Sequence, residues 1–209
     1  MDASAKRQIG IMGGNFNPIH NGHLAIAQKA YEQFGLDEIW LMPAYVQPLK
    51  QGLAVTPAEH RLNMVKLAAE GNEHFKACTY ELDKQGVSYT AETLKELCLM
   101  HPDCDFSFIL GADSIYTFDH WKKPEQICAC ARLLAAKRHQ KGKDDCLLYE
   151  KAEEHRRNFG ARIEFIEAPF YDISSTQVRE LLEDDELAKE QTIIPAKVYA
   201  YIRENGLYK

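Results

Sequence analysis

The sequence has 209 residues, of which 45% are hydrophobic and 27% are charged, and it carries a formal net charge of −6. A chain of this length and composition can bury one full hydrophobic core, so we expect one domain over residues 1–209 with a flexible tail at residues 1–7. The acidic charge argues against nucleic acid as a partner, because duplex binding needs a basic patch, and no apolar run approaches the roughly 20 residues of a membrane-spanning helix.

Short apolar runs alternate with helical patterns along the chain. The run at 9–12 predicts a buried strand that ends in a tight turn at Gly13–Gly14, and the helix after it is expected to stop at Gly35. Thr56 and Pro57 are typical of a helix start, with a capping box and proline at the first helical position. Further strands are predicted at 38–42, 75–82, 106–110, 133–136 and 163–166, and further helices after Thr90 and near Ser175 and Ala196.

This alternation predicts an α/β fold. We expect a single-domain, doubly wound, Rossmann-like sheet of five to six mostly parallel strands, with helices on both faces. In such sheets ligands bind beyond the carboxyl ends of the strands, where loops lead into helices. The most unusual residues of this chain follow predicted strands, so we expect the functional site at that edge. An exposed polar loop is predicted at 140–145.

The segment from Gly13 to His23 reads GGNFNPIHNGH. Adjacent glycines let backbone N–H groups approach a ligand closely, and a helix start adds N–H donors and partial positive charge, which suits a phosphate. His20 and His23 are three residues apart, so at a helix start they face the same object. The alternatives are a plain glycine turn with surface histidines, or a metal site, which lacks an obvious third ligand. The adjacent glycines do not fit the GxGxxG dinucleotide fingerprint.

This segment resembles the GGxFxPxHxGH signature of the nucleotidyltransferase superfamily, whose members join ATP or CTP to a phosphorylated acceptor and release pyrophosphate. Residues 173–179, ISSTQVR, resemble the ISSTxxR motif of its pyridine-nucleotide branch. The resemblance covers nearly the whole chain, because further elements follow in the order seen in bacterial nicotinate-nucleotide adenylyltransferases: Ser88-Tyr89-Thr90, Gly111-Ala112-Asp113, Trp121 and Lys137-Arg138. Three positions depart from the family pattern, which more often has threonine, aspartate and histidine where this chain has Asn15, Asn17 and Leu49.

The second motif, Ser174 to Arg179, begins another predicted helix. Its hydroxyls can cap that helix, with Gln177 completing a capping box, or they can bind phosphate. Arg179 favours phosphate, because a guanidinium one turn into a helix can reach a ligand at the helix start. We therefore expect two helix starts, one with the histidine pair and one with hydroxyls and Arg179, to converge on a single triphosphate.

Residues between the two motifs have both structural and binding interpretations. Asp113 can accept hydrogen bonds from ribose hydroxyls or cap a helix, and Trp121 can stack on a pyridine ring or pack in the core. The hydroxyls and backbone of Ser88, Tyr89 and Thr90 can donate to a nicotinate carboxylate, although Thr90 also fits a helix cap. Lys137-Arg138 at a strand end can face phosphate or solvent.

The resemblance implies adenylyl transfer from ATP, with Mg²⁺, to nicotinate mononucleotide, with His20, His23 and Arg179 as the catalytic residues. It implies that ATP is bound by Gly13, Gly14, Asn15, Phe16, His20, His23, Lys50, Arg138, Ile173, Ser174, Ser175, Thr176 and Arg179. It implies that the acceptor is bound by Ser88, Tyr89, Thr90, Gly111, Asp113 and Trp121. No protein metal site is expected.

Other functions stay open at this stage. They are a nicotinamide mononucleotide or phosphopantetheine adenylyltransferase, which has the same chemistry on another acceptor, and a non-catalytic nucleotide sensor. The six cysteines lack paired CxxC spacing, which is typical of reduced thiols, and with no export signal we expect a cytoplasmic protein. Whether the chain forms homo-oligomers is left open by the sequence.

Overall fold

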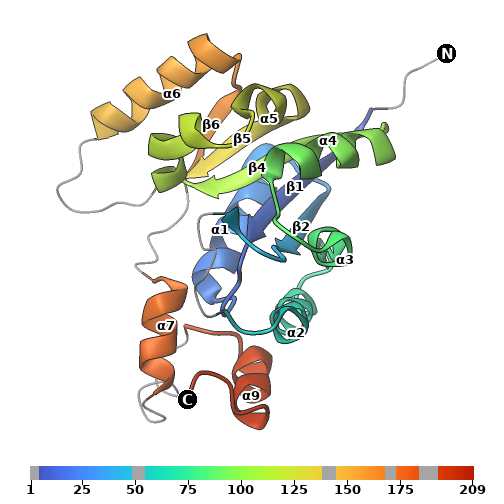
Figure 1. The fold of residues 1–209 in the computed structure, drawn as a ribbon, viewed down its shortest axis with the longest axis vertical. Coiled ribbons are helices and arrows are strands. Elements are labelled where there is room, and N and C mark those ends of the chain that lie inside the picture. Colours follow the sequence, from blue (N-terminus) through green and yellow to red (C-terminus); the bar gives the residue numbers. More distant parts are fainter. Residues whose placement is uncertain (1–4, 49–54, 138–144, 168–172, 184–192) are drawn as a thin grey trace.

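Six parallel strands form one sheet in the order β3-β2-β1-β4-β5-β6 (Figure 1). The strands are β1 (Arg7–Gly14), β2 (Glu38–Pro43), β3 (Phe75–Ala77), β4 (Cys104–Gly111), β5 (Ala131–Ala136) and β6 (Ile163–Ile166). The computed structural model describes residues 5–48, 55–137, 145–167, 173–183 and 193–209. The predicted doubly wound sheet is confirmed: β1 and β4 lie at its centre, and all its pairings are parallel.

Helices cover both faces of this sheet (Figure 1). They are α1 (Asn21–Phe34), α2 (Ala58–Ala69), α3 (Tyr80–Lys84), α4 (Thr90–Met100), the 3-10 helix η2 (Ala112–His120), α5 (Pro124–Cys130), α6 (Asp145–Phe159), α7 (Ser175–Leu182) and α9 (Ala196–Glu204). Helices α4, η2, α5 and α6 bury residues in one hydrophobic cluster, and α1, α2, α7 and α9 bury residues in another.

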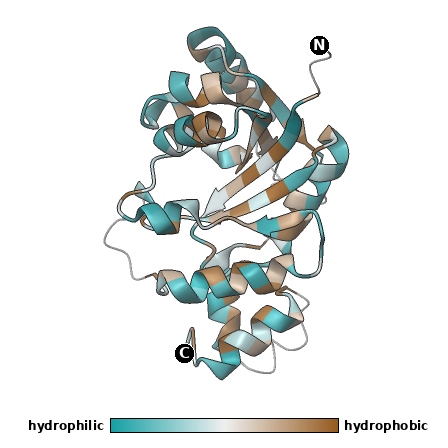
Figure 2. Cartoon of the chain, turned by 90° about the vertical axis from the view of Figure 1, so that its right-hand side faces the viewer, coloured by the Kyte–Doolittle hydropathy of each residue, from teal (hydrophilic) through white to brown (hydrophobic). Residues whose placement is uncertain are grey.

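The two clusters lie on opposite faces of the sheet because side chains alternate along each strand. In β4, Phe106 and Phe108 belong to the first cluster and Ile109 belongs to the second. In β5, Leu133 and Leu134 divide in the same way. Figure 2 shows the resulting hydrophobic colouring along the strands between more hydrophilic helices. Burial on both faces explains why these strands are continuous apolar runs in the sequence.

The start of β1 and the end of β3 differ from the prediction. β1 begins at Arg7, inside the predicted tail, because the Arg7 backbone N–H donates to the carbonyl of Asp103 at 3.0 Å and its guanidinium pairs with Glu38 at 2.9 Å. The tail prediction is therefore wrong for Arg7, and residues 1–4 lie outside the described residues. The strand predicted at 75–82 ends at Ala77.

The segment after β3 forms the short helix α3 instead of more strand. The Thr79 hydroxyl donates to the Asp83 carboxylate at 2.6 Å, and the Asp83 N–H donates to the Thr79 carbonyl at 2.9 Å. These bonds between residues four apart favour a helical turn over an extended chain. Alternation of apolar residues alone did not reveal them.

The predicted stop of α1 is confirmed, whereas the predicted start of α2 is wrong in detail. Gly35 adopts φ 58° and ψ 45°, the left-handed conformation that commonly ends a helix. Pro57 precedes α2 as its N-cap, where no side-chain cap bond forms, so Thr56 and Glu59 make no capping box. The Thr56 N–H instead donates to the Asn17 side chain at 3.3 Å, which places this segment against the glycine-histidine loop.

Three further helices were not predicted: η2, α5 and α6. The polar loop predicted at 140–145 falls outside the described residues except for Asp145, which begins α6. Within the described part of the chain, no helix is both long and apolar enough to cross a membrane.

Candidate functional site

The candidate site lies at the carboxyl edge of the sheet, between β1 and β4. These strands are neighbours, β2 lies beyond β1, and β5 lies beyond β4. The connections that leave β1 and β4 therefore run in opposite directions and open a crevice at the strand ends. β1 ends at Gly14 and β4 ends at Gly111, so both predicted glycine segments border this crevice.

The histidine pair lies at the start of α1. His20 is the N-cap, and its ring centroid lies 3.7 Å from that of His23. The His20 backbone N–H donates to Nδ1 of His23 at 3.3 Å. A neutral His23 whose Nδ1 accepts this bond carries its proton on Nε2, which leaves Nε2 as a donor. The spacing thus places both rings together, as predicted.

The turn before α1 is a strained segment held by packing. Phe16 has φ 46°, in the left-handed region that non-glycine residues rarely adopt, and its side chain is buried. Its ring lies beside Gly14 and meets the His23 ring edge-on, with centroids 5.2 Å apart. Such strain persists where the surroundings over-determine the backbone, and it concentrates at functional sites.

Arg61 on α2 binds the backbone of this turn, and no sequence pattern predicted this role for Arg61. Its guanidinium donates to the carbonyls of Thr56 at 2.9 Å, Asn15 at 2.9 Å, Ala44 at 2.7 Å and Tyr45 at 3.3 Å. Burial lowers the pKa of Arg61 from its ordinary value. One buried cation therefore joins the loops after β1 and β2. The signal was an arginine on the buried face of α2, in helical spacing with Met64, Val65 and Ala68.

The second predicted motif docks onto the same turn. Ser174 caps α7 as expected: its Oγ accepts from the Gln177 N–H at 3.3 Å, and its own N–H donates to the Gln177 side chain at 2.8 Å. The Ser175 hydroxyl donates to the Pro18 carbonyl at 2.9 Å. Arg179 donates to the Asn17 carbonyl at 2.8 Å. Residues about 160 positions apart in the sequence thus meet at one turn.

The starts of α1 and α7 also touch through their apolar atoms. A Cβ built on Gly22 would lie 2.9 Å from Cγ2 of Ile173 and 3.0 Å from Nδ1 of His20. Only glycine permits this approach without a shift of one segment. The two helix starts therefore converge, as the two motifs predicted.

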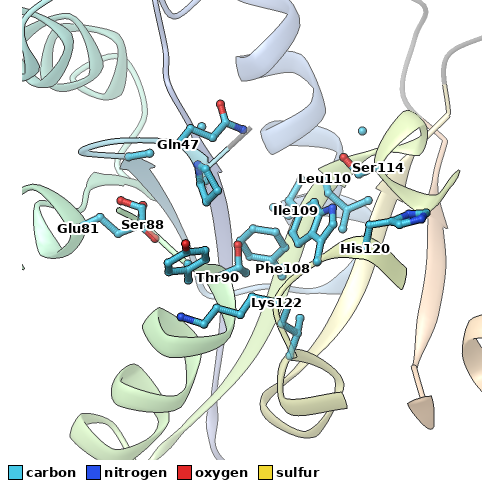
Figure 3. A pocket seen from close by; sticks show the side chains of 18 residues that line it. Gln47, Glu81, Ser88, Thr90, Phe108, Ile109, Leu110, Ser114, His120 and Lys122 are labelled. Atoms are coloured by element: carbon cyan, nitrogen blue, oxygen red, sulfur yellow. The ribbon is translucent and has the colours of Figure 1, made fainter. Parts of the chain in front are cut away.

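Beside this junction is a cavity of about 470 Å³ (Figure 3). In Figure 3 Ser88 and Thr90 lie on one side of Phe108, and Ser114 and His120 lie on the other. Of the predicted residues, those on the cavity wall are Gly13, Gly14, Ser88, Tyr89, Thr90, Gly111 and Trp121. Elements from β1 to η2 thus bring the glycine loop and most of the predicted acceptor residues around one space.

Some predicted residues lie elsewhere. His20, His23 and Arg179 do not line the cavity. They lie at the turn that follows Gly14, where the two rings lie close together and Arg179 donates to the Asn17 carbonyl. Asp113 lies in the first turn of η2 with an exposed side chain and is also absent from the wall, although Gly111 and Ser114 contribute to it.

Aromatic packing positions one wall of the cavity. Trp121 lies against Phe118 and Phe108, with ring centroids 5.6 Å and 6.3 Å away, and its buried Nε1 has no hydrogen-bond partner among the described residues. Trp121 is therefore both a core residue and a cavity residue. On the opposite wall, the Lys122 ammonium lies 3.8 Å from the Tyr89 ring centroid and 2.7 Å from the Glu92 carboxylate.

Glu81 is a second residue that the sequence analysis missed. This buried carboxylate lines the cavity and accepts a hydrogen bond from the Thr93 hydroxyl at 2.8 Å. Burial raises the pKa of Glu81, and hydrogen bonds from Thr93 and Ser88 oppose that rise. The Ser88 Oγ also accepts from the Tyr45 N–H at 3.1 Å. Through its own hydrogen bond with Ser88, Glu81 therefore helps to position the Ser88–Thr90 loop. No local pattern marked it.

The remaining predictions at this edge can be placed only in part. Lys50 and Arg138 lie outside the described residues, whereas Lys137 donates to the Tyr149 hydroxyl. Asn15, Ile173 and Thr176 lie in the turn or at the start of α7, as described above. Within the ranges that the structure covers, no group of three or more His, Cys, Asp or Glu side chains could hold a metal ion. All six cysteines are free thiols, and burial raises the pKa of Cys128 to about 11.

Comparisons with known proteins agree with this arrangement. The model of the cytidylyltransferase-like family matches residues 11–181. The chain is 37% identical to a probable nicotinate-nucleotide adenylyltransferase of Lachnoclostridium phytofermentans, over 97% of this chain and 99% of that protein. It is 38% identical to a protein of the same name from Clostridium tetani, over 95% and 98% of the two chains.

Solved structures share the fold. The Plasmodium falciparum nicotinic acid mononucleotide adenylyltransferase complexed with NaAD superposes with a TM-score of 0.76 and 22% identity, over 97% of both chains. The same enzyme complexed with APC gives a TM-score of 0.74. By the family model and by its identity with these relatives, the chain belongs to the cytidylyltransferase-like family and, within it, to the nicotinate-nucleotide adenylyltransferases.

Proposed function

We propose that the chain transfers the adenylyl group of ATP to the phosphate of nicotinate mononucleotide, giving nicotinate adenine dinucleotide and pyrophosphate in NAD biosynthesis. The observation that carries this proposal is the cavity that joins the Gly13–Gly14 loop to Ser88, Thr90 and Trp121, beside two converging helix starts. The curated relatives bear the name of this activity, and the Plasmodium neighbours were solved with NaAD and with APC.

The chemistry requires alignment and charge neutralisation more than a base. The 5′-phosphate of the acceptor has a second pKa of about 6, so near neutral pH it is mostly a dianion and already nucleophilic. One of its oxygens bonds to the α-phosphorus of ATP while the bond from that phosphorus to the bridging oxygen breaks, and pyrophosphate leaves in line. The protein contributes by holding both substrates and stabilising the spreading negative charge.

In this proposal the two parts of the site, the starts of α1 and α7 and the cavity beside them, have different tasks. His20 and His23 donate to the reacting phosphates, and Arg179 binds the leaving pyrophosphate from the start of α7, with Lys50 and Arg138 as further cations. The glycine loop and Ser174 to Thr176 hold the other phosphate oxygens through backbone and hydroxyl donors. The cavity between Tyr89 and Trp121 holds the pyridine ring, with the Ser88–Thr90 segment at its carboxylate and Asp113 at the ribose.

Mg²⁺ enters this proposal as part of the substrate, bound to the phosphates of ATP. A divalent ion there neutralises charge on the leaving oxygens and fixes their orientation. The cytoplasmic location and the oligomeric state stay predictions from the sequence.

A single assay tests the function: pyrophosphate release from Mg·ATP with nicotinate mononucleotide, nicotinamide mononucleotide or phosphopantetheine as acceptor. We expect release with nicotinate mononucleotide and much slower release with the other two. Faster release with nicotinamide mononucleotide would reassign the acceptor within the same chemistry. ATP binding without release for any acceptor would leave the nucleotide-sensor interpretation in place of the enzyme.

A further inference from the structure

Beyond α9 the chain returns to the glycine-histidine loop. Figure 1 shows α9 and the C-terminus beside α7 and α2, at the same end of the molecule. The Tyr208 hydroxyl donates to Oδ1 of Asn17 at 2.8 Å, a contact between residues 191 positions apart. No motif in the sequence analysis includes Tyr208, and the proposed reaction does not use it.

Three distant segments of the chain form hydrogen bonds with Asn17. Its side-chain oxygen accepts from Tyr208 and from the Thr56 backbone N–H, and its carbonyl accepts from Arg179. Asn17 is buried, directly after the strained Phe16. Whatever fixes the Asn17 side chain therefore also fixes the turn between the glycines and the histidine pair, and the carbonyl to which Arg179 docks.

The backbone of Tyr208 indicates that this contact is specific. Tyr208 has φ 60°, a left-handed conformation that non-glycine residues rarely adopt. The strain is tolerated because the phenol reaches a buried polar site. Burial raises the pKa of Tyr208 to about 12, against the opposing effects of a hydrogen bond with the Thr56 side chain and of the charges of Arg179 and Arg61, so the phenol stays a neutral donor across the physiological range.

We propose that Tyr208 is a positioning residue for ATP: its hydroxyl orients Asn17 and thereby holds the 15–20 turn and Arg179 in their binding arrangement. The inference rests on the proposed function, because it assumes that this turn binds the nucleotide. The Tyr208 hydroxyl bonds to Asn17, whereas the loop at 88–90 bonds to Tyr45, so the effect should be on ATP and not on the acceptor.

The test compares two variants that each remove one tyrosine hydroxyl from the C-terminal segment. Tyr208→Phe removes the donor to Asn17. Tyr201→Phe is the matched control, because the Tyr201 hydroxyl bonds to His60 at 2.8 Å and Asn63 at 3.0 Å, which connects α9 to α2 away from the turn. The measurements are the Kd of Mg·ATP by calorimetry, KM for both substrates, and the melting temperature.

We expect Tyr208→Phe to weaken ATP binding on the order of fivefold, the usual effect of one lost hydrogen bond, with KM for nicotinate mononucleotide within about twofold of wild type. Tyr201→Phe should lower the melting temperature and leave ATP binding unchanged. Unchanged ATP binding in Tyr208→Phe, or an equal loss in both variants, would overturn the proposal. The equal loss would indicate a general effect of α9 docking.

A double-mutant cycle with Asn17→Ala provides a second measurement, since it isolates the contact itself. Without Asn17 as acceptor, Tyr208→Phe should have little further effect on ATP binding, and fully additive effects would count against the proposal. Calorimetry needs no acceptor, so these outcomes can be told apart from failure of the enzyme assignment. That failure would appear as absent pyrophosphate release by the wild type.

Discussion

The backbone N–H of His20 prepares the His23 ring for its proposed task. The His20 N–H donates to Nδ1 of His23, so a neutral His23 carries its proton on Nε2. The rings lie close together, so both can act on one group of phosphate oxygens. A donor aimed at charge that develops in the transition state is worth far more than one that binds the ground state.

We therefore expect His23→Ala to lower kcat on the order of 100-fold, with a smaller change in KM for ATP. The measurement is steady-state pyrophosphate release, with circular dichroism to verify folding. His101→Ala is the control, because His101 follows α4 and packs beside Trp40, away from the two helix starts. A folded His23→Ala protein with wild-type turnover would remove His23 from the mechanism.

Glu81 is a residue whose charge opposes stability. Its pKa is raised in the folded protein, so the native state keeps this proton to a higher pH than the unfolded chain does. Its contribution to stability is complete below the ordinary carboxyl pKa of about 4.3 and is lost as pH rises through the raised value. Burial disfavours the ionised form of Glu81, and hydrogen bonds from Thr93 and Ser88 compensate this only in part.

Glu81→Gln should therefore raise the melting temperature relative to wild type at pH 7, with the difference shrinking toward pH 4. Thermal unfolding monitored across that range measures this trend. Glu96→Gln is the control, because hydrogen bonds from Lys84 and Tyr80 lower the pKa of Glu96, which gives the opposite sign. A difference for Glu81→Gln that is independent of pH would contradict the assignment of a raised pKa.

Among the elements, α1 and α7 determine the geometry of the proposed phosphate site. Their starts meet at Gly22 and Ile173, and hydrogen bonds from Ser175 and Arg179 tie α7 to the turn before α1. A small change in their separation changes the relative position of the histidines and Arg179. Because in-line transfer needs close alignment, an error of about 1 Å can lower the rate on the order of 100-fold.

Gly22→Ala tests this geometry. Alanine is the better helix former by about 1 kcal/mol, yet its Cβ would lie 2.9 Å from Cγ2 of Ile173, so Ile173 or one of the two helix starts must shift. We expect kcat/KM for ATP to fall between about 10- and 100-fold without a large loss of helix content. Gly71→Ala is the matched control, since a Cβ there meets nothing within 4 Å. Equal activities of the two variants would show that this contact is unimportant.

On the scale of the whole molecule, one sheet positions every part of the site. The strand order places β1 next to β4, although about 90 residues separate them in the chain, and the crevice between their ends is therefore part of the folded core. A ligand in that crevice bridges segments from both halves of the domain. Binding should thus stabilise the whole fold, because the unfolded chain has no such site.

Mg·ATP at about 100 times its Kd should add roughly 2.7 kcal/mol to the free energy of unfolding, which for a domain of this size corresponds to roughly 5–10 °C in melting temperature. Differential scanning fluorimetry measures the shift. Adenosine at the same concentration is the control, and its shift should be much smaller because the proposed contacts are to phosphates. An equal shift with adenosine would mean that phosphate groups contribute little.

The sequence by itself determined the features that depend on local physics. Apolar runs located the strands, because parallel strands are buried on both faces, and Gly35 and Ser174 marked a helix end and a helix start through backbone conformation and capping. The two motifs identified the histidine pair and the α7 start, since three-residue spacing on a helix sets which side chains face together. The fold class followed from the alternation alone.

Only the tertiary structure decided which distant residues support and surround the site. Arg61, Glu81 and Tyr208 act through carbonyls, hydroxyls and an amide far away in the sequence, and no local periodicity encodes such partners. Which predicted residues line the cavity, Gly111 but neither Asp113 nor the histidines, likewise depends on tertiary packing. Local patterns restrict backbone conformation within a few residues, whereas contacts between segments depend on how the sheet brings loops together after folding.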